Sequence, residues 1–183
     1  MGPAGAGHLF RVARLAAAVV VVAVSARVSV PVPGTDVPQS LQTLAVLVVG
    51  SWLGMREGTL ALTAYVLVGA LGAPVFSDGG SGWAHLAGST GGYLVGFVVA
   101  AGALGLCSDR GLTNRVGWAF AAMLGGHVVI LALGWAWLGT SVGAAAAYQG
   151  GVAPFLVGGV AKSMVGTLIA VLIARRNSGA QLP

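Results

Sequence analysis

The sequence predicts an all-α integral membrane protein, a compact bundle of six transmembrane helices with both termini in the cytoplasm. Of its 183 residues, 57% are hydrophobic and 7% are charged, whereas a soluble globular protein carries about 25% charged residues. The hydrophobic residues form runs of membrane-spanning length, and the basic residues collect at alternate ends of these runs. We therefore expect a single membrane domain over residues 1–183 and exclude a water-soluble enzyme.

The six helices follow from the positions of the apolar runs. A helix needs about 20 mainly apolar residues to cross a bilayer core about 30 Å thick. The runs place helices at residues 9–30, 39–53, 58–71, 88–106, 116–138 and 154–174. The second and third are short for a full span, so we expect them to tilt or to have their ends covered by other protein.

The distribution of arginine predicts the orientation, because short loops rich in Lys and Arg stay in the cytoplasm. With six spans, seven arginines fall on the cytoplasmic side: Arg11, Arg14, Arg56, Arg110, Arg115, Arg175 and Arg176. The opposite side receives only Arg27, with Asp36 and Asp78. This bias predicts a multi-pass protein of the cytoplasmic membrane.

The first segment has a second interpretation. Its arginines, the apolar run that follows and the triplet Val24-Ser25-Ala26 also resemble a cleavable signal peptide. Cleavage would leave five spans and reverse the charge bias at one terminus, and the apolar pattern continues to Val30, so we favour a retained helix.

The basic residues do not indicate a nucleic-acid partner. The formal net charge is +5, but these residues stand singly or in pairs instead of clustering on one polar face. The single cysteine, Cys107, forms no internal disulfide, and no Cys/His cluster has the spacing of a zinc site. We expect neither a metal nor a cofactor.

Small residues at four-residue spacing predict how the helices pack, because they let two backbones approach closely in lipid. Such stripes occur in three later segments and in the first: Gly88, Gly92, Gly96 and Ala100; Gly117, Ala121 and Gly125; Gly158, Lys162 and Gly166; and Ala13 with Ala17. We expect each stripe to face another helix.

Three polar side chains stand out within or near the spans. Lys162 is the only lysine and lies inside the last predicted span, where a charge costs about 2.5–3.5 kcal/mol on insertion scales. It either snorkels to the outer interface or faces the bundle and binds an anionic group, and its glycine-lined face favours the second. His127 is expected to be a hydrogen-bonded bundle residue. Asp78 lies in a glycine-rich turn, as a cap or a ligand contact.

The connection between the first two helices carries three prolines in eight residues, at positions 31, 33 and 38. Proline fixes its backbone φ angle and lowers the entropy that a segment loses on becoming ordered. The connection is either a preformed outer flap or a rigid turn between two spans.

Three sequence blocks, in order along the chain, resemble the BioY family. They are VPGTDVPQSLQTL at 32–44, GALGAPVF at 69–76 and GSTGGYLVGF at 88–97. The resemblance extends from about Val30 to Lys162. It implies the biotin-capturing S component of an energy-coupling-factor transporter, a six-helix protein without catalytic chemistry that holds biotin near its outer face.

The resemblance also implies the residues that bind the ligand. Thr35, Gln42 and Thr43 would belong to the lid and the adjoining helix. The pocket wall would include Gly91, Gly92 and Tyr93, and its polar end would include Lys162, with Asp78 as a further candidate. The family pattern Gly-Asp-x-x-Lys reads Gly158-Gly159-Val160-Ala161-Lys162 here, so a glycine stands where the family has an acceptor for the ureido ring of biotin. The ligand is therefore expected to be either biotin or a biotin-like anion.

The partners implied are membrane lipid, a transmembrane coupling protein and ATPase subunits, because the chain has no Gly-x-x-x-x-Gly-Lys-[Ser/Thr] loop of its own. Ala13 and Ala17 are the expected docking face. Two other hypotheses are an intramembrane serine protease, from Ser81 in a Gly-x-Ser-Gly turn with His127, and an assembly subunit without a small ligand.

Overall fold

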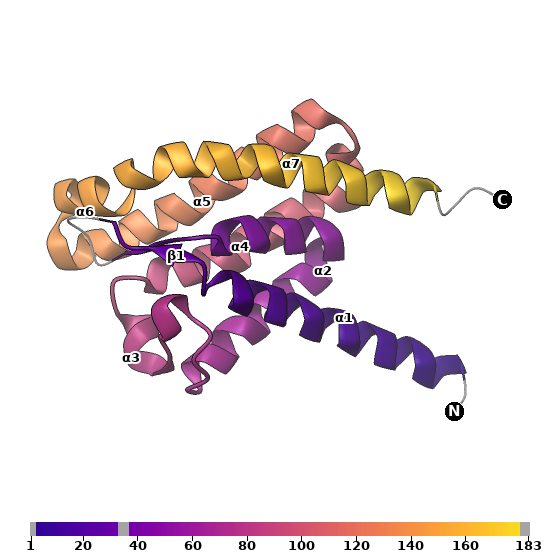
Figure 1. Ribbon diagram of the computed structural model, residues 1–183, viewed down its shortest axis with the longest axis horizontal. Coiled ribbons are helices and arrows are strands. Elements are labelled where there is room, and N and C mark those ends of the chain that lie inside the picture. The colour runs from indigo at the N-terminus through magenta and orange to yellow at the C-terminus, as the bar shows by residue number, and fades with distance from the viewer. Residues whose placement is uncertain (1–2, 33–36, 180–183) are drawn as a thin grey trace.

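The computed structural model describes residues 3–32 and 37–179, which form helices and one short β-hairpin (Figure 1). The long helices are α1 (Pro3–Ser25), α2 (Gln42–Ala70), α4 (Gly91–Asp109), α5 (Val116–Val142) and α7 (Leu156–Gly179). The short elements are β1 (Ser29–Val30), β2 (Gln39–Ser40), η1 (Ser77–Gly79), α3 (Gly82–Ala87), η2 (Leu112–Asn114), α6 (Ala144–Gly151) and η3 (Ala153–Phe155). By length and composition, five helical segments of the described residues could cross a membrane: Gly7–Ser25, Gln42–Ala70, Gly91–Asp109, Val116–Val142 and Ala144–Arg176. The fold is that of a multi-pass membrane protein.

The predicted helices 39–53 and 58–71 are joined in α2, which folds back on itself at Gly54. The side-chain amide of Gln42 donates a hydrogen bond to the Tyr65 hydroxyl, 23 residues further along the chain. A straight helix of this length would separate them by about 34 Å. Gly54 has φ 81° and ψ 176°, a conformation that is essentially restricted to glycine. The two halves of α2 therefore form an antiparallel helical hairpin.

The end of α4 stabilises the turn of this hairpin. The Asp109 carboxylate accepts a hydrogen bond from the Met55 backbone N–H at 2.9 Å, which satisfies a donor that the start of the second half would leave unpaired. The Ser108 hydroxyl donates to the Ser51 carbonyl at 2.7 Å. Two neighbouring side chains of α4 thus bind both halves of the hairpin.

Several predicted helix boundaries were wrong by a few residues. Helix α1 ends at Ser25, where the 9–30 prediction continued, and the chain then enters β1, which pairs antiparallel with β2 in the register Ser29 to Ser40 and Val30 to Gln39. Helix α5 continues beyond residue 138 to Val142, and the φ of 84° at Gly143 separates it from α6, which was not predicted. Apolar periodicity does not detect breaks that depend on one glycine.

The small-residue stripe was right on α4 from Gly92 onward, although its first member, Gly88, lies before this helix, and the stripe on α5 was wrong. A side chain at Gly92 would overlap Trp137 and Leu133 of α5, so this glycine allows the close contact that was predicted. On α5, the Gly117 and Gly125 positions have no neighbour within 4 Å, and the buried face instead includes Gly126, Ile130 and Gly134. Small residues at four-residue spacing occur on more than one face of α5. Contacts with the neighbouring helices determine which of these faces is buried.

The molecule has two distinct ends. The N- and C-termini lie at one end, which we call the terminal end (Figure 1). Here Arg11 and Arg14 approach the Glu57 carboxylate, at 3.2 and 3.8 Å. The β-hairpin, α3 and α6 lie at the opposite end, which we call the pocket end (Figure 1).

Candidate ligand-binding pocket

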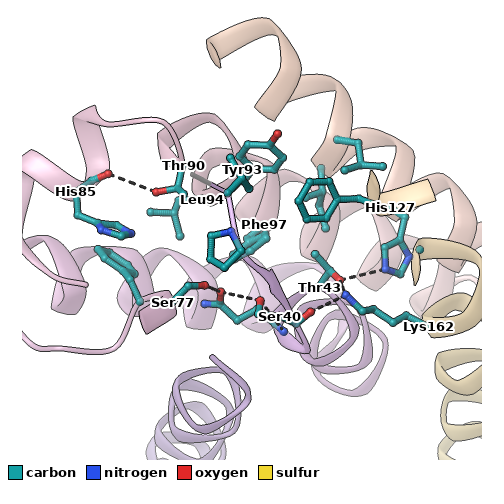
Figure 2. A pocket seen from close by; sticks show the side chains of 18 residues that line it. Ser40, Thr43, Ser77, His85, Thr90, Tyr93, Leu94, Phe97, His127 and Lys162 are labelled. Carbon is teal, nitrogen blue, oxygen red and sulfur yellow. Dashed lines mark hydrogen bonds between the residues drawn. The ribbon is translucent and has the colours of Figure 1, made fainter. Parts of the chain in front are cut away.

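A pocket lies at the pocket end, between the β-hairpin, the start of α2, the η1–α3 segment and helices α4, α5 and α7. Its walls surround about 640 Å³ of empty space, a volume that includes the open solvent at its mouth. Its lining is mostly apolar, with polar groups at two places. The residues that line it are Val37, Pro38, Ser40, Gln42, Thr43, Phe76, Ser77, His85, Thr90, Tyr93, Leu94, Phe97, His127, Ile130, Leu131, Phe155, Gly159 and Lys162. Figure 2 shows the two polar groups next to each other along the pocket, with Ser77 at one side, Lys162 and His127 at the other, and Ser40 between them.

The first polar group, which we call the cationic end, is built around Lys162 of α7. Its ammonium donates to the Ser40 carbonyl and, at 3.3 Å, to the Thr43 hydroxyl. Thr43 also lies 3.2 Å from Nε2 of His127. The side chain of Lys162 therefore faces the bundle, as the glycine-lined face of its helix predicted, and not the lipid.

His127 of α5 is buried and has polar contacts at both ring nitrogens. Nε2 faces Thr43, while Nδ1 lies 3.1 Å from the Met123 carbonyl and 3.0 Å from the Ser163 hydroxyl. The sequence-based prediction of a hydrogen-bonded bundle histidine is confirmed.

The second polar group, which we call the neutral end, is built around Gln42. Its side-chain oxygen accepts hydrogen bonds from the Ser77 and Ser40 hydroxyls, and its nitrogen donates to Tyr65. The Tyr65 hydroxyl in turn donates to the Val75 carbonyl at 2.8 Å. These bonds join α2 to the segment that leads into η1, so this end of the pocket is both polar and rigid.

His85 of α3 completes the neutral end. Its ring stacks on Phe76, with centroids 5.1 Å apart and an interplanar angle of 18°. Burial lowers the pKa of His85 below its ordinary value of 6.5, and the negative charge of Asp78 opposes that shift in part. His85 therefore contributes a neutral aromatic wall at pH 7.

The structure brings together four of the residues proposed from sequence and places the others elsewhere. Gln42, Thr43, Tyr93 and Lys162 all line the pocket. The Tyr93 ring faces the pocket while its hydroxyl donates to the Gly151 carbonyl at 2.7 Å. The hydroxyl is thus already engaged within the protein.

The two glycines next to Tyr93 do not line the pocket. A side chain at Gly91 would overlap the Leu86 carbonyl, and one at Gly92 would overlap α5. They set the spacing between helices and position Tyr93 without forming the wall themselves.

Asp78 is exposed and accepts a hydrogen bond from the Ser29 hydroxyl at 2.7 Å. It lies outside the pocket lining and ties η1 to the base of the β-hairpin. Thr35 lies outside the described residues. Ala13 and Ala17 are exposed on α1 and do not line the pocket.

The remaining lining residues were not predicted as site residues. Phe76, Phe97, Phe155 and Ile130 are apolar, and their sequence pattern is that of any buried helix residue. The three phenylalanines come from α4, from η3 and from the connection that precedes η1. Their convergence depends on how each helix is rotated in the bundle.

The geometry does not support the serine protease hypothesis. Ser81 is the residue before α3, with extended backbone, and it does not line the pocket that contains His127. The contacts of His127 are Met123, Thr43 and Ser163. Among the described residues, no group of three or more His, Cys, Asp or Glu side chains could hold a metal ion.

Comparison with known proteins shows the family and agrees with this fold. The sequence profile of the BioY family matches residues 6–179. A "Probable biotin transporter BioY" of Pyrococcus horikoshii is 37% identical over 161 residues, covering 88% of this chain and 91% of the relative. A "Biotin transporter BioY" of Rhizobium etli is 38% identical over 142 residues, covering 73% and 75%.

A solved structure has the same fold. The crystal structure of the S-component for biotin from an ECF-type ABC transporter superimposes with a TM-score of 0.82, at 20% identity, over 97% of this chain and 95% of that chain. With its profile match and its relatives above 30% identity, this chain belongs to the BioY family.

Proposed function

We propose that this protein is the substrate-capture subunit of a biotin transporter, and that it holds biotin in the pocket between the cationic and neutral ends. The observation that carries the proposal is a mostly apolar pocket with a single ammonium group at one side, in a chain of the BioY family. Relatives named biotin transporter cover most of the chain. The alternative is a biotin analogue or another small anion.

The chemistry of biotin fits this division of the pocket. Biotin has an apolar sulfur-containing ring, a ureido group with two N–H donors and one carbonyl, and an alkyl chain that ends in a carboxylate. The aromatic and aliphatic wall would bury the ring and the chain. The two polar ends would bind the two polar groups.

We assign the carboxylate to Lys162. A charge in a low-dielectric pocket is stabilised most by an opposite charge, and the ammonium keeps donor capacity after binding Ser40 and Thr43. Gln42, Thr43 and Tyr93 would contact the ligand directly. Thr35 would belong to a flap over the pocket, and Gly91, Gly92 and Asp78 would act by holding the wall and the β-hairpin in place.

We also propose six membrane spans over one domain, residues 1–183, in the cytoplasmic membrane with both termini inside. The antiparallel halves of α2 supply two of the six. The terminal end carries Arg11 and Arg14 together with both termini (Figure 1), as expected for a cytoplasmic side. Apolar side chains such as Leu9, Val20 and Leu168 are exposed on the outer helix faces, where lipid would cover them.

Transport would require partners, because capture alone moves nothing across the membrane. We propose a transmembrane coupling protein with ATPase subunits. The exposed Ala13 and Ala17 of α1 support a docking face, since small side chains allow a partner helix to approach closely.

Equilibrium binding of labelled biotin to the purified chain in detergent tests the proposal. We expect saturable binding that unlabelled biotin displaces and an unrelated vitamin does not. Absence of binding by the wild type, with binding gained in Gly159→Asp, would show that the fold is that of a biotin carrier and that the ligand has changed.

The Gly159→Asp variant is a fair probe of the site. A Cβ at Gly159 would lie 3.7 Å from the His127 ring, an ordinary van der Waals contact. If the ureido group lies at this end of the pocket, the added carboxylate accepts from its N–H groups and should strengthen biotin binding about 10- to 100-fold. If the biotin carboxylate lies here, at Lys162, the added charge should weaken binding instead. If the protein is an assembly subunit without a small ligand, neither the wild type nor Gly159→Asp should bind biotin.

A further inference from the structure

The charge of Lys162 is not neutralised by any acidic side chain that the structure describes. Of the four acids in the chain, Glu57 approaches Arg11 and Arg14, Asp78 binds Ser29, and Asp109 binds the Met55 backbone, while Asp36 lies outside the described residues. The position of the ammonium is therefore set by uncharged groups, of which only Thr43 is a side chain.

The Thr43 hydroxyl has one proton, and its neighbours decide where that proton points. An ammonium group has donors and no acceptor, so Thr43 must accept from Lys162. Its own proton is then free for Nε2 of His127, at 3.2 Å. This bond requires a lone pair, and not a proton, on Nε2.

The opposite side of the ring selects the matching tautomer. The carbonyl of Met123, at 3.1 Å from Nδ1, is an acceptor and requires a proton on Nδ1. The Ser163 hydroxyl donates to the Gly159 carbonyl at 2.8 Å, so it too can only accept from Nδ1, at 3.0 Å. Both contacts place the proton of the neutral ring on Nδ1 and leave the lone pair on Nε2.

We propose that His127 is a positioning residue for Lys162, acting through Thr43, and that Ser163 fixes the tautomer that allows this. The hydrogen bonds run in one direction only, from Lys162 to Thr43 to His127 and then to Met123 and Ser163. Thr43 cannot turn its proton toward Lys162 without losing His127. The ammonium is thereby held at the pocket wall in one orientation (Figure 2), ready to donate to a ligand acceptor.

The chain allows a direct test, because Lys162 is its only lysine. Full-length protein labelled with [13Cε,15Nζ]lysine gives one ε-CH2 NMR cross-peak without assignment. In His127→Leu, which has no acceptor for Thr43, we expect this peak to shift and broaden. In His127→Gln, whose side-chain oxygen replaces Nε2 as acceptor, we expect it to return toward the wild-type position.

Thr167→Val is the matched control. Thr167 is buried on α7 one turn beyond Ser163 and donates to the Ser163 carbonyl, but it does not touch His127 or line the pocket. Its loss should lower thermal stability and leave the lysine peak in place. An unchanged peak in His127→Leu, or equal changes in the Leu, Gln and Thr167→Val variants, would overturn the proposal.

The functional consequence rests on the proposed function and is measured separately. If biotin is the ligand, His127→Leu should bind it about tenfold more weakly and His127→Gln within about threefold of wild type. Wild-type affinity in His127→Leu would contradict the positioning role. If the wild type binds no biotin, the proposed function fails, and the NMR measurement on the ligand-free protein still decides the role of His127.

Discussion

The two polar ends of the pocket differ in how their hydrogen bonds are used. At the neutral end, the Gln42 oxygen already accepts from two hydroxyls and its nitrogen donates to Tyr65. At the cationic end, Lys162 keeps donor capacity and an uncompensated charge. Most hydrogen-bonding groups of the neutral end are paired within the protein. The charge and the remaining donor of the cationic end are paired only when a ligand binds.

This difference indicates that the cationic end determines the preference for an anionic ligand. A saturated network contributes shape and rigidity, because a ligand cannot replace its bonds without leaving a buried group unpaired. An unsaturated charge contributes preference for an anion. Substitutions at the two ends should therefore change affinity in different patterns, which can be compared by using biotin and its uncharged amide.

The largest effect is expected from Lys162→Ala. Removal of the ammonium should weaken biotin binding by about 10- to 100-fold and bring the affinities for biotin and biotin amide together. Titration of both ligands against wild type and variant checks this. If the preference for biotin over its amide survives the substitution, Lys162 contacts the ureido carbonyl and the assignment of the carboxylate is wrong.

Thr43→Val should have the next largest effect. It keeps the shape of the side chain but removes both the acceptor for Lys162 and the donor to His127, so we expect about tenfold weaker binding. Thr43→Ser retains the hydroxyl and should remain close to wild type. Equal losses in the two variants would show that the methyl group, and not the hydrogen bonds, matters at this position.

Gln42→Leu should produce a smaller and unselective loss. We expect biotin and biotin amide to weaken by the same factor, about two- to tenfold, together with a lower unfolding temperature, because Ser77 and Tyr65 lose their partner. A larger loss for biotin than for the amide would mean that the neutral end also recognises charge, against the contrast proposed here.

The smallest effect concerns His85 and pH. Because burial lowers its pKa below 6.5, the folded protein binds fewer protons there than the unfolded chain, so its stability should fall as the pH drops below about 6.5. His85→Phe keeps the stacking on Phe76 and removes this titration. Unfolding temperatures of both proteins between pH 7.5 and 5.5 should diverge toward low pH, with the wild type losing more. Parallel curves would contradict a titrating His85.

Much of the fold could be predicted from local sequence signals. The apolar runs indicated the membrane class and most helices, and the small-residue spacing of α4 correctly predicted a close contact with α5 at Gly92. The same reasoning failed at Gly117 and Gly125, because glycine and alanine occur on several faces of α5. Choosing among such faces requires the partner helix.

The sequence predicted the candidate site only where a charged residue stood out within an apolar run. Lys162 stood out as the only lysine inside an apolar run, and its position facing the bundle is confirmed. His127 was noticed as a bundle residue, but nothing in the sequence connected it to Thr43, 84 positions away. Asp78 lies beside the pocket without lining it, and a glycine-rich turn does not show which way its carboxylate points.

The sequence alone determined that the chain belongs in a membrane, where most of its long helices lie along the chain, and that the interior must accommodate one positively charged side chain. These properties depend on composition and on periodicity within about 20 residues. Tertiary structure decided that aromatic residues from separate segments share one wall and that Thr43 joins Lys162 to His127. Each of these depends on helix rotation and on contacts between distant residues, which hydrophobic patterning leaves free.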